Sequence, residues 1–291
     1  MLGGSIPALV TPFRDEALDE AAYRAFVAWQ IAEGSKGLVP CGTTGESATL
    51  RPEEHCRAIE ICVEEAGGRI PVIAGCGSND TAHAIALMRS AREAGADYAL
   101  VVPPYYNRPN QEGIYAHFAA LADAVDLPIL LYNVPARTVT DIAVETMAKL
   151  AAMDAVVGIK DATGNLARVS AQRAACGKLF VQLSGNDDMA LGFNAMGGTG
   201  CISVTANVAP RLCADFQEAC AEGKWDAALA LQDRLFPLHT ALFSDASPGP
   251  TKYALNRLRP EFPDALRLPM TPPSAASRAV VDDALRHARL A

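Results

Sequence analysis

Eight short apolar runs, rich in β-branched residues and separated by stretches of helical periodicity, constrain this 291-residue chain more than any other feature. The runs span residues 6–10, 37–39, 70–74, 98–102, 128–132, 155–159, 179–183 and 200–204. Their starts lie about 20 to 34 residues apart, which is the length of a strand, a helix and two loops. The pattern therefore predicts a chain of βα units.

The stretches between the runs carry helix start and stop signals. Asp19 is expected to cap a helix that ends at Gly34, because a carboxylate can accept from free backbone amides and glycine favours a helix end. Pro52, followed by two glutamates, suits the first turn of a second helix. Asn79 is expected to cap a third helix that ends near Gly95.

Near-continuous apolar strands followed by helices favour a closed (β/α)8 barrel, whose strands are buried on both faces. The competing fold is an open doubly wound sheet. Such a sheet usually has a glycine-rich turn after its first strand, and this chain has Thr11–Arg14 there. Beyond the last run only helical periodicity remains, with breaks at Ser247–Pro250 and Pro269–Pro273. We therefore expect an α/β barrel over residues 1–225 and a small C-terminal helical domain over residues 226–291.

Charge and cysteine usage narrow the class of protein. With 33 acidic residues against 25 Lys and Arg, the net charge is −8, which argues against nucleic acid or an anionic membrane surface as a partner. The N-terminal residues lack the basic region of a signal peptide, and no apolar stretch is long enough to span a bilayer. The eight cysteines form no C-x-x-C pair and the five histidines are scattered. We expect a cytoplasmic protein with free thiols and no metal site.

The residues that end the strands matter most, because a barrel of this kind builds its active site at the C-terminal ends of its strands. Lys160 directly follows the apolar run 155–159, the only one of six lysines to close such a strand. An amine there would be partly desolvated, which favours the neutral form that attacks a carbonyl. The alternative is a lysine that reaches solvent or pairs with Asp161 or Asp187.

Other strand ends supply polar groups that each have a second interpretation. Tyr132 and Thr43 could pass protons, or could be an aromatic filling the barrel mouth and a hydroxyl capping a turn. Thr44, next to Thr43, could help to hold a carboxylate. Arg137 could bind a second substrate carboxylate through two parallel hydrogen bonds, or could form a surface ion pair.

Taken together, the motifs Gly42–Glu46 and Tyr132–Pro135 and the order of the strand ends resemble the class I, Schiff-base-forming family of pyruvate-dependent lyases and synthases. The resemblance extends from Gly4 to Met270. It implies that Lys160 forms an imine with pyruvate, and that no further cofactor takes part.

The resemblance also implies roles for the surrounding residues. Thr43, Tyr132 and Tyr106 match a proton-relay triad, in which Tyr106 comes from a neighbouring subunit. Thr44 matches a residue that binds the pyruvate carboxylate. Two further pocket positions are matched: Gly185, and Ile202 through its backbone carbonyl.

Within the family, the segment Pro135–Thr138 resembles the synthases that condense pyruvate with L-aspartate-4-semialdehyde on the route to diaminopimelate and lysine. Arg137 would bind the semialdehyde carboxylate. Two alternatives stay open: an aldolase that releases pyruvate from a 2-keto-3-deoxy sugar acid or N-acetylneuraminate, and a non-catalytic barrel that binds a keto acid. By the same resemblance we expect a homotetramer built as a dimer of dimers.

A regulatory site for lysine is a further implication of the resemblance. The matching positions lie at a subunit interface of the family: Ser47, Ala48, His55, Asn79, His83 and Tyr105. His83 stands where a glutamate usually holds the effector's ammonium, and Pro52 stands where a histidine is common. Because an imidazole is a poor partner for a cation, we expect weak or absent inhibition by lysine.

Overall fold

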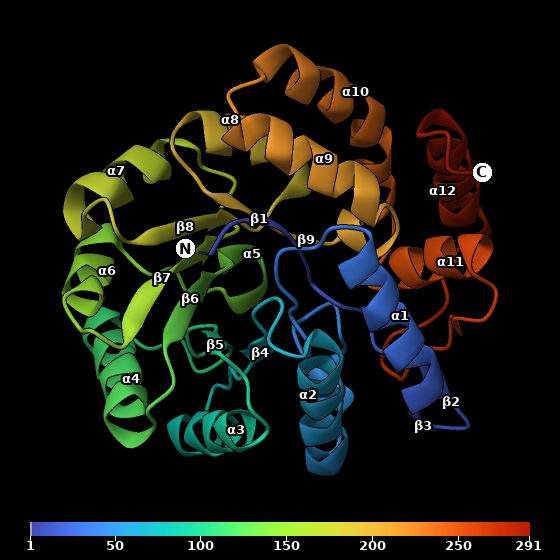
Figure 1. Ribbon diagram of the computed structural model, residues 1–291. Coiled ribbons are helices and arrows are strands. Elements are labelled where there is room, and N and C mark those ends of the chain that lie inside the picture. The colour runs from blue at the N-terminus through green and yellow to red at the C-terminus, as the bar shows by residue number, and fades with distance from the viewer. Residues whose placement is uncertain (1) are drawn as a thin grey trace.

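The computed structural model describes residues 2–291, which alternate between strands and helices along the chain (Figure 1). The strands are β1 (Gly4–Pro7), β2 (Phe13–Arg14), β3 (Ala17–Leu18), β4 (Ile73–Gly75), β5 (Tyr98–Val101), β6 (Ile129–Asn133), β7 (Val156–Asp161), β8 (Val181–Ser184) and β9 (Gly200–Ser203). The helices of the first two thirds are α1 (Glu20–Ala32), α2 (Pro52–Ala66), α3 (Thr81–Glu93), α4 (Gln111–Ala124), α5 (Pro135–Thr138), α6 (Val144–Ala151), α7 (Ala167–Cys176) and α8 (Ala190–Ala195). Those of the last third are α9 (Pro210–Ala221), α10 (Trp225–Ala241), α11 (Gly249–Leu258) and α12 (Ala275–His287), and short 3-10 turns cover Ser47–Thr49, Asp187–Met189 and Thr205–Asn207.

Seven of the strands formed by residues 2–291 build one parallel sheet in the order β1-β9-β8-β7-β6-β5-β4. The run 37–39 closes the ring between the two edges, since Val39 bridges to Ala8 and Leu38 bridges to Val72. Figure 1 shows the helices arranged around these strands. The fold is therefore the expected (β/α)8 barrel, with its second strand reduced to two isolated bridges.

Most of the expected helix ends are found, with one shifted by a residue. Asp19 caps α1 by accepting from the amide of Ala22, and Pro52 is the first residue of α2. The third helix is capped by Asp80, whose carboxylate accepts from Ala82, and the expectation for Asn79 is wrong. Asp80 competes successfully because its side chain lies next to the free amides of the first turn.

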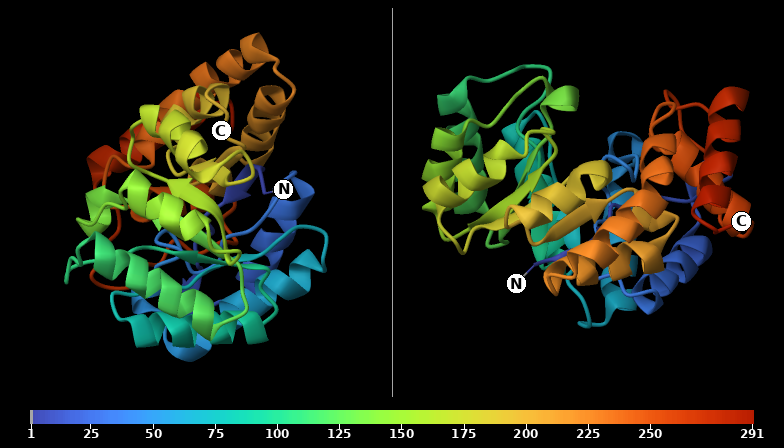
Figure 2. Two further views of the ribbon diagram at one scale, coloured as in Figure 1. Left: turned by 90° about the vertical axis from the view of Figure 1, so that its left-hand side faces the viewer. Right: turned by 90° about the horizontal axis from the view of Figure 1, so that it is seen from above.

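Beyond β9 the chain forms helices and one 3-10 turn but no further strand, as the sequence predicts. Helices α9, α10 and α12 share a second apolar cluster, whose largest members include Phe216, Leu235 and Leu285. The views of Figure 2 show α11 and α12 at one side of the molecule. Phe262 packs against Phe26 of α1 with ring centroids 5.0 Å apart and the rings tilted by 58°. The division at residue 225 stays a prediction, and it coincides with the start of α10.

Two properties of residues 2–291 bear on the class of protein. None of their helices combines the length and the apolar character of a membrane span. In the same residues, no group of three or more His, Cys, Asp or Glu side chains lies close enough to hold a metal ion.

Candidate active site

Lys160 and Tyr132 lie side by side at the C-terminal ends of neighbouring strands. They are register partners in β7 and β6, so their side chains point to the same face of the sheet. Both are buried, Lys160 with 6% of its surface exposed, and the Lys160 Nζ lies 4.0 Å from the centre of the Tyr132 ring. The ammonium form can be stabilised by the ring face, and the neutral amine would be shielded from bulk water.

The carboxylates that could have neutralised Lys160 are occupied elsewhere. Asp161 accepts from Thr163, Arg168 and Gln172 on the outer side of the strand. Asp187 accepts from the backbone amide of Val204 at 2.8 Å and from the Ser203 hydroxyl. Within residues 2–291, Lys160 forms no ion pair. The alternative of a structural salt bridge is therefore not realised at this lysine.

The loop after the second strand places Thr43 and Thr44 at the same end of the barrel. Successive turns hold it, because the amide of Gly45 donates to Gly42 at 3.0 Å and the amide of Glu46 donates to Thr43 at 3.2 Å. Thr43 is exposed and lines the cavity described below, whereas Thr44 is buried. Neither threonine hydroxyl hydrogen-bonds to a protein atom within the described residues, which leaves both available to a ligand.

Arg137 lies in the last turn of the short helix α5, immediately after β6. It is exposed, lines the cavity, and forms no ion pair with the residues that the structure describes. Two side-chain hydrogen bonds fix the turn that carries it. Thr138 donates to the Thr140 carbonyl at 2.8 Å, and Thr140 donates to the Pro104 carbonyl at 2.9 Å. A guanidinium that forms no ion pair with the described residues, on a turn fixed by hydrogen bonds, is well placed to bind a carboxylate.

Gly185 directly follows β8 and lies close to the lysine side chain. A Cβ on Gly185 would lie 2.7 Å from the Ala162 Cβ and 3.1 Å from Lys160 Cε, so a larger residue would displace Ala162 and crowd the lysine. Ile202 is fully buried in β9, beside Ile6 of β1. Of these two positions, Gly185 therefore bounds the space beside the lysine.

A cavity of about 470 Å³ opens at this end of the barrel. Thr43, Tyr132 and Arg137 line it, while Lys160 lies behind the Tyr132 ring and does not itself line it. Most of the residues expected for regulation line the same cavity: Ser47, Ala48, His55, His83 and Tyr105. The volume suits a small organic acid, and both groups of residues line this one cavity.

Tyr106 is not brought to the other site residues. It is 90% exposed, takes a positive φ of 70°, and does not line the cavity. Asn79 does not line it either, and its backbone carbonyl accepts from Asn107 at 2.8 Å. A role for Tyr106 in a site would thus require a second copy of the chain.

His55 and His83 differ in their surroundings although both line the cavity. His55 is buried and its Nε2 lies 2.8 Å from the Gly75 carbonyl, while its Nδ1 has no partner among the described residues. Burial lowers the pKa of His55, partly offset by the Gly75 carbonyl, and the neighbouring His83 lowers it further. His83 is exposed. Because the residue at this position is a histidine, it offers no carboxylate to an ammonium group.

Sequence reasoning missed four residues that fasten the C-terminal segment over the cavity, which we call the C-terminal clamp: Glu46, Glu54, Lys252 and Arg267. Lys252 is fully buried and its Nζ lies 2.6 Å from Glu46 Oε1. Arg267 donates to both oxygens of Glu54, at 2.7 and 2.6 Å. The clamp lets Pro248 and Met270 form one wall of the cavity. The only signal in the sequence was the pair of proline-rich breaks.

Comparison with known proteins agrees with this geometry. The model of the "Dihydrodipicolinate synthetase family" matches residues 1–288. Curated proteins named 4-hydroxy-tetrahydrodipicolinate synthase are similar over the full length of both chains, from Rhizorhabdus wittichii at 69% identity and Zymomonas mobilis at 63%. A crystal structure of the dihydrodipicolinate synthase from Acinetobacter baumannii, complexed with pyruvate, is 40% identical, covers all of both chains and superimposes with a TM-score of 0.97.

Proposed function

The chain belongs to the dihydrodipicolinate synthetase family, and we propose that it is a lyase that condenses pyruvate with L-aspartate-4-semialdehyde. The product is (4S)-4-hydroxy-tetrahydrodipicolinate, on the route to diaminopimelate and lysine. The observation that carries the proposal is a buried lysine amine with no counter-ion among the described residues, 4.0 Å from the ring centre of a tyrosine that lines the cavity.

Pyruvate enters first. The neutral amine of Lys160 attacks its keto carbon and forms a carbinolamine, which loses water to give an imine. Tyr132 and Thr43 line the cavity, so their hydroxyls can carry protons to the departing oxygen and from the methyl group. Loss of a methyl proton leaves an enamine on Lys160. Thr44 and the amides of its turn would hold the pyruvate carboxylate, and Gly185 and the Ile202 carbonyl would flank the imine.

The semialdehyde enters second. The enamine carbon attacks its aldehyde carbon, the amino group of the same substrate then displaces the Lys160 amine, and the ring closes. The guanidinium of Arg137 supports this choice of substrate, because it lines the cavity and pairs with no carboxylate of residues 2–291. A sugar-acid aldolase has no evident use for that group, and a non-catalytic binder needs no nucleophile.

The proposal includes features beyond the single chain. All the chemistry rests on side chains and a covalent imine, so the reaction needs no further cofactor. A neighbouring subunit would supply Tyr106, in a homotetramer made of two dimers. The protein would work in the cytoplasm.

The test combines trapping with turnover. Pyruvate and borohydride should leave a stable adduct on Lys160, located by peptide mass spectrometry, and Lys160→Ala should form none. A coupled assay should show turnover with pyruvate and the semialdehyde, and none with keto-sugar acids or N-acetylneuraminate. Turnover by Lys160→Ala would end the proposal, and cleavage of a sugar acid alone would favour the aldolase. An adduct without turnover on any of these substrates would favour the binding protein.

A further inference from the structure

The residues that follow Tyr132 and Lys160 form a second pair on the opposite face of the sheet. Asn133 and Asp161 are the next register partners in β6 and β7. Because side chains alternate along a strand, they point outward where the reactive pair points inward. Both are buried, Asn133 completely. Tyr132 and Lys160 are thus each followed in their strand by a buried polar residue on the outer face of the sheet.

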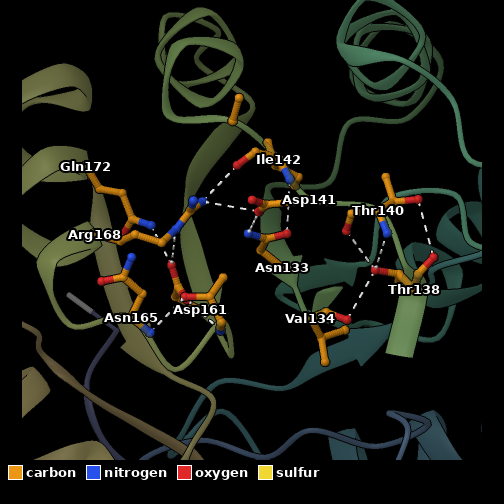
Figure 3. A network of polar contacts seen from close by, with 12 residues as sticks. Asn133, Val134, Thr138, Thr140, Asp141, Ile142, Asp161, Asn165, Arg168 and Gln172 are labelled. Carbon is orange, nitrogen blue, oxygen red and sulfur yellow. Dashed lines mark hydrogen bonds and ion pairs between the residues drawn. The ribbon is translucent and has the colours of Figure 1, made fainter. Parts of the chain in front are cut away.

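Figure 3 shows how Arg168 of α7 joins these two outer residues. Arg168 Nε donates to Asp161 Oδ2 at 3.2 Å, and its Nη2 donates to the Ile142 carbonyl at 2.8 Å and lies 3.6 Å from Asp141 Oδ1. Asn133 donates to Asp141 at 2.7 Å and accepts from the amide of Ile142 at 3.1 Å. One guanidinium therefore ties the ends of β6 and β7 together through the segment that follows α5.

Asp161 is fully engaged in this network. Its Oδ2 also accepts from Gln172 at 2.5 Å, while its Oδ1 accepts from the backbone amide of Thr163 at 2.9 Å. The Asp161 side chain is 3% exposed and that of Arg168 is 13% exposed. Burial of a fully hydrogen-bonded pair makes the arrangement rigid, since breaking either partner leaves an uncompensated charge.

The inner face explains why such rigidity matters. Lys160 forms no ion pair with any residue that the structure describes, so the position of its amine depends on the strand that carries it and on the Tyr132 ring. The space beside its Cε is narrow, since a Cβ on Gly185 would lie only 3.1 Å away. A displacement of about 1 Å at a reacting atom can cost about 10²-fold in rate.

We infer that Arg168 and Asp161 are positioning residues for imine formation, which hold Lys160 against Tyr132 from the outer face of the barrel. The inference rests on the proposed function. A residue that only stabilised the fold would change how much active enzyme is present. A positioning residue changes the first-order rate constant at which each folded molecule forms its adduct.

The experiment measures adduct formation with pyruvate at saturation by rapid quench into borohydride, for wild type, Arg168→Gln and Asp161→Asn. Arg173→Gln is the matched control, because Arg173 lies on the same helix and contacts the Met196 carbonyl outside the network. We expect rate constants about 10- to 100-fold lower for Arg168→Gln and Asp161→Asn, and unchanged for the control. The double variant should be no slower than the slower single variant, because in this inference both residues act through the one network that ties the ends of β6 and β7 together.

Wild-type rate constants with reduced amplitudes for Arg168→Gln and Asp161→Asn would overturn the inference, because they would indicate stability alone. Additive losses in the double variant would overturn it as well. If Asp161→Asn fails to fold, Arg168→Gln still decides the question, since it leaves Asp161 its hydrogen bonds from Gln172 and from the Thr163 amide. Failure of the wild type to form any adduct would instead defeat the proposed function.

Discussion

At the scale of single residues, Lys160 and Tyr132 could be predicted from the sequence, whereas the buried Lys252 of the C-terminal clamp could not. Lys160 and Tyr132 each end an apolar run, so strand periodicity alone places them at one edge of the sheet. Lys252 is buried more deeply, yet its partner Glu46 is 206 residues away in the sequence. Its burial follows from how α11 packs on the barrel mouth, which no local pattern encodes. Burial lowers the pKa of Lys252 to about 8, against the opposing effect of Glu46.

Tyr132→Phe separates the two uses of this aromatic side chain. The ring remains beside the Lys160 amine, so the fold and the adduct with pyruvate should persist. Loss of the hydroxyl should lower kcat by about 10²- to 10⁴-fold, the usual contribution of a positioned acid–base group. Steady-state kinetics checks this, with Tyr98→Phe, a tyrosine at the start of β5, as the control. A kcat near that of the wild type would assign Tyr132 a packing role only.

Arg137→Ala tests whether Arg137 binds the carboxylate of the semialdehyde. The guanidinium has no partner in the described part of its own chain, so its removal should leave the melting temperature unchanged. We expect the KM for the semialdehyde to rise and kcat to fall, by about 10-fold or more in kcat/KM, as for loss of a charged hydrogen bond. The KM for pyruvate should change little. Equal effects on both substrates, measured against Arg108→Ala as a control, would count against this assignment.

At the scale of elements, the sequence predicts where strands and helices alternate, but it does not predict the shortest strands. The hairpin of β2 and β3 was not expected, because its turn residues Asp15 and Glu16 take positive φ without a glycine to signal it. The second strand survives as two bridges because it is only three residues long. The outer network escaped prediction as well, since Asp161 looked like a possible partner of Lys160 until the register placed it on the opposite face.

The Arg267–Glu54 contact of the C-terminal clamp predicts how stability depends on pH. The hydrogen bond from Arg267 is the largest cause that lowers the pKa of Glu54 from 4.5 to about 2. The folded state therefore binds fewer protons than the unfolded state between these values. The contribution of Glu54 is complete above pH 4.5 and is lost as the pH falls toward 2.

Thermal melts between pH 7 and the acid limit of folding check this prediction. Glu54→Gln should melt below the wild type at neutral pH, and the difference should shrink steadily as the pH falls below 4.5. Glu60→Gln is the control, because Glu60 lies on the same helix in an exposed ion pair with Arg57. If the difference in melting temperature between wild type and Glu54→Gln did not change with pH, protonation of Glu54 would not be coupled to folding.

At the scale of the whole molecule, the single chain forms the barrel and the cavity and leaves Tyr106 outside that cavity. Tyr106 is almost wholly exposed, and Tyr105 and Val139 nearby are also exposed apolar residues. A second copy that covered this surface around a two-fold axis would bring each Tyr106 toward the other chain, since such an interface repeats every contact twice. Sequence reasoning reached this expectation through the resemblance alone, because no pattern within one chain encodes what its surface meets.

Complementation between two inactive variants tests whether Tyr106 acts in the partner's site. Tyr106→Phe and Lys160→Ala should each be nearly inactive alone. In a mixed dimer, the subunit that keeps Lys160 receives an intact Tyr106 from its partner, so one of the two sites is complete. Random reassembly of equal amounts should then restore about a quarter of wild-type activity, because half the dimers are mixed and half their sites are whole. No recovery, with mixed dimers confirmed by native mass spectrometry, would place Tyr106 outside the partner's chemistry. Full activity of Tyr106→Phe alone would remove it from the reaction altogether.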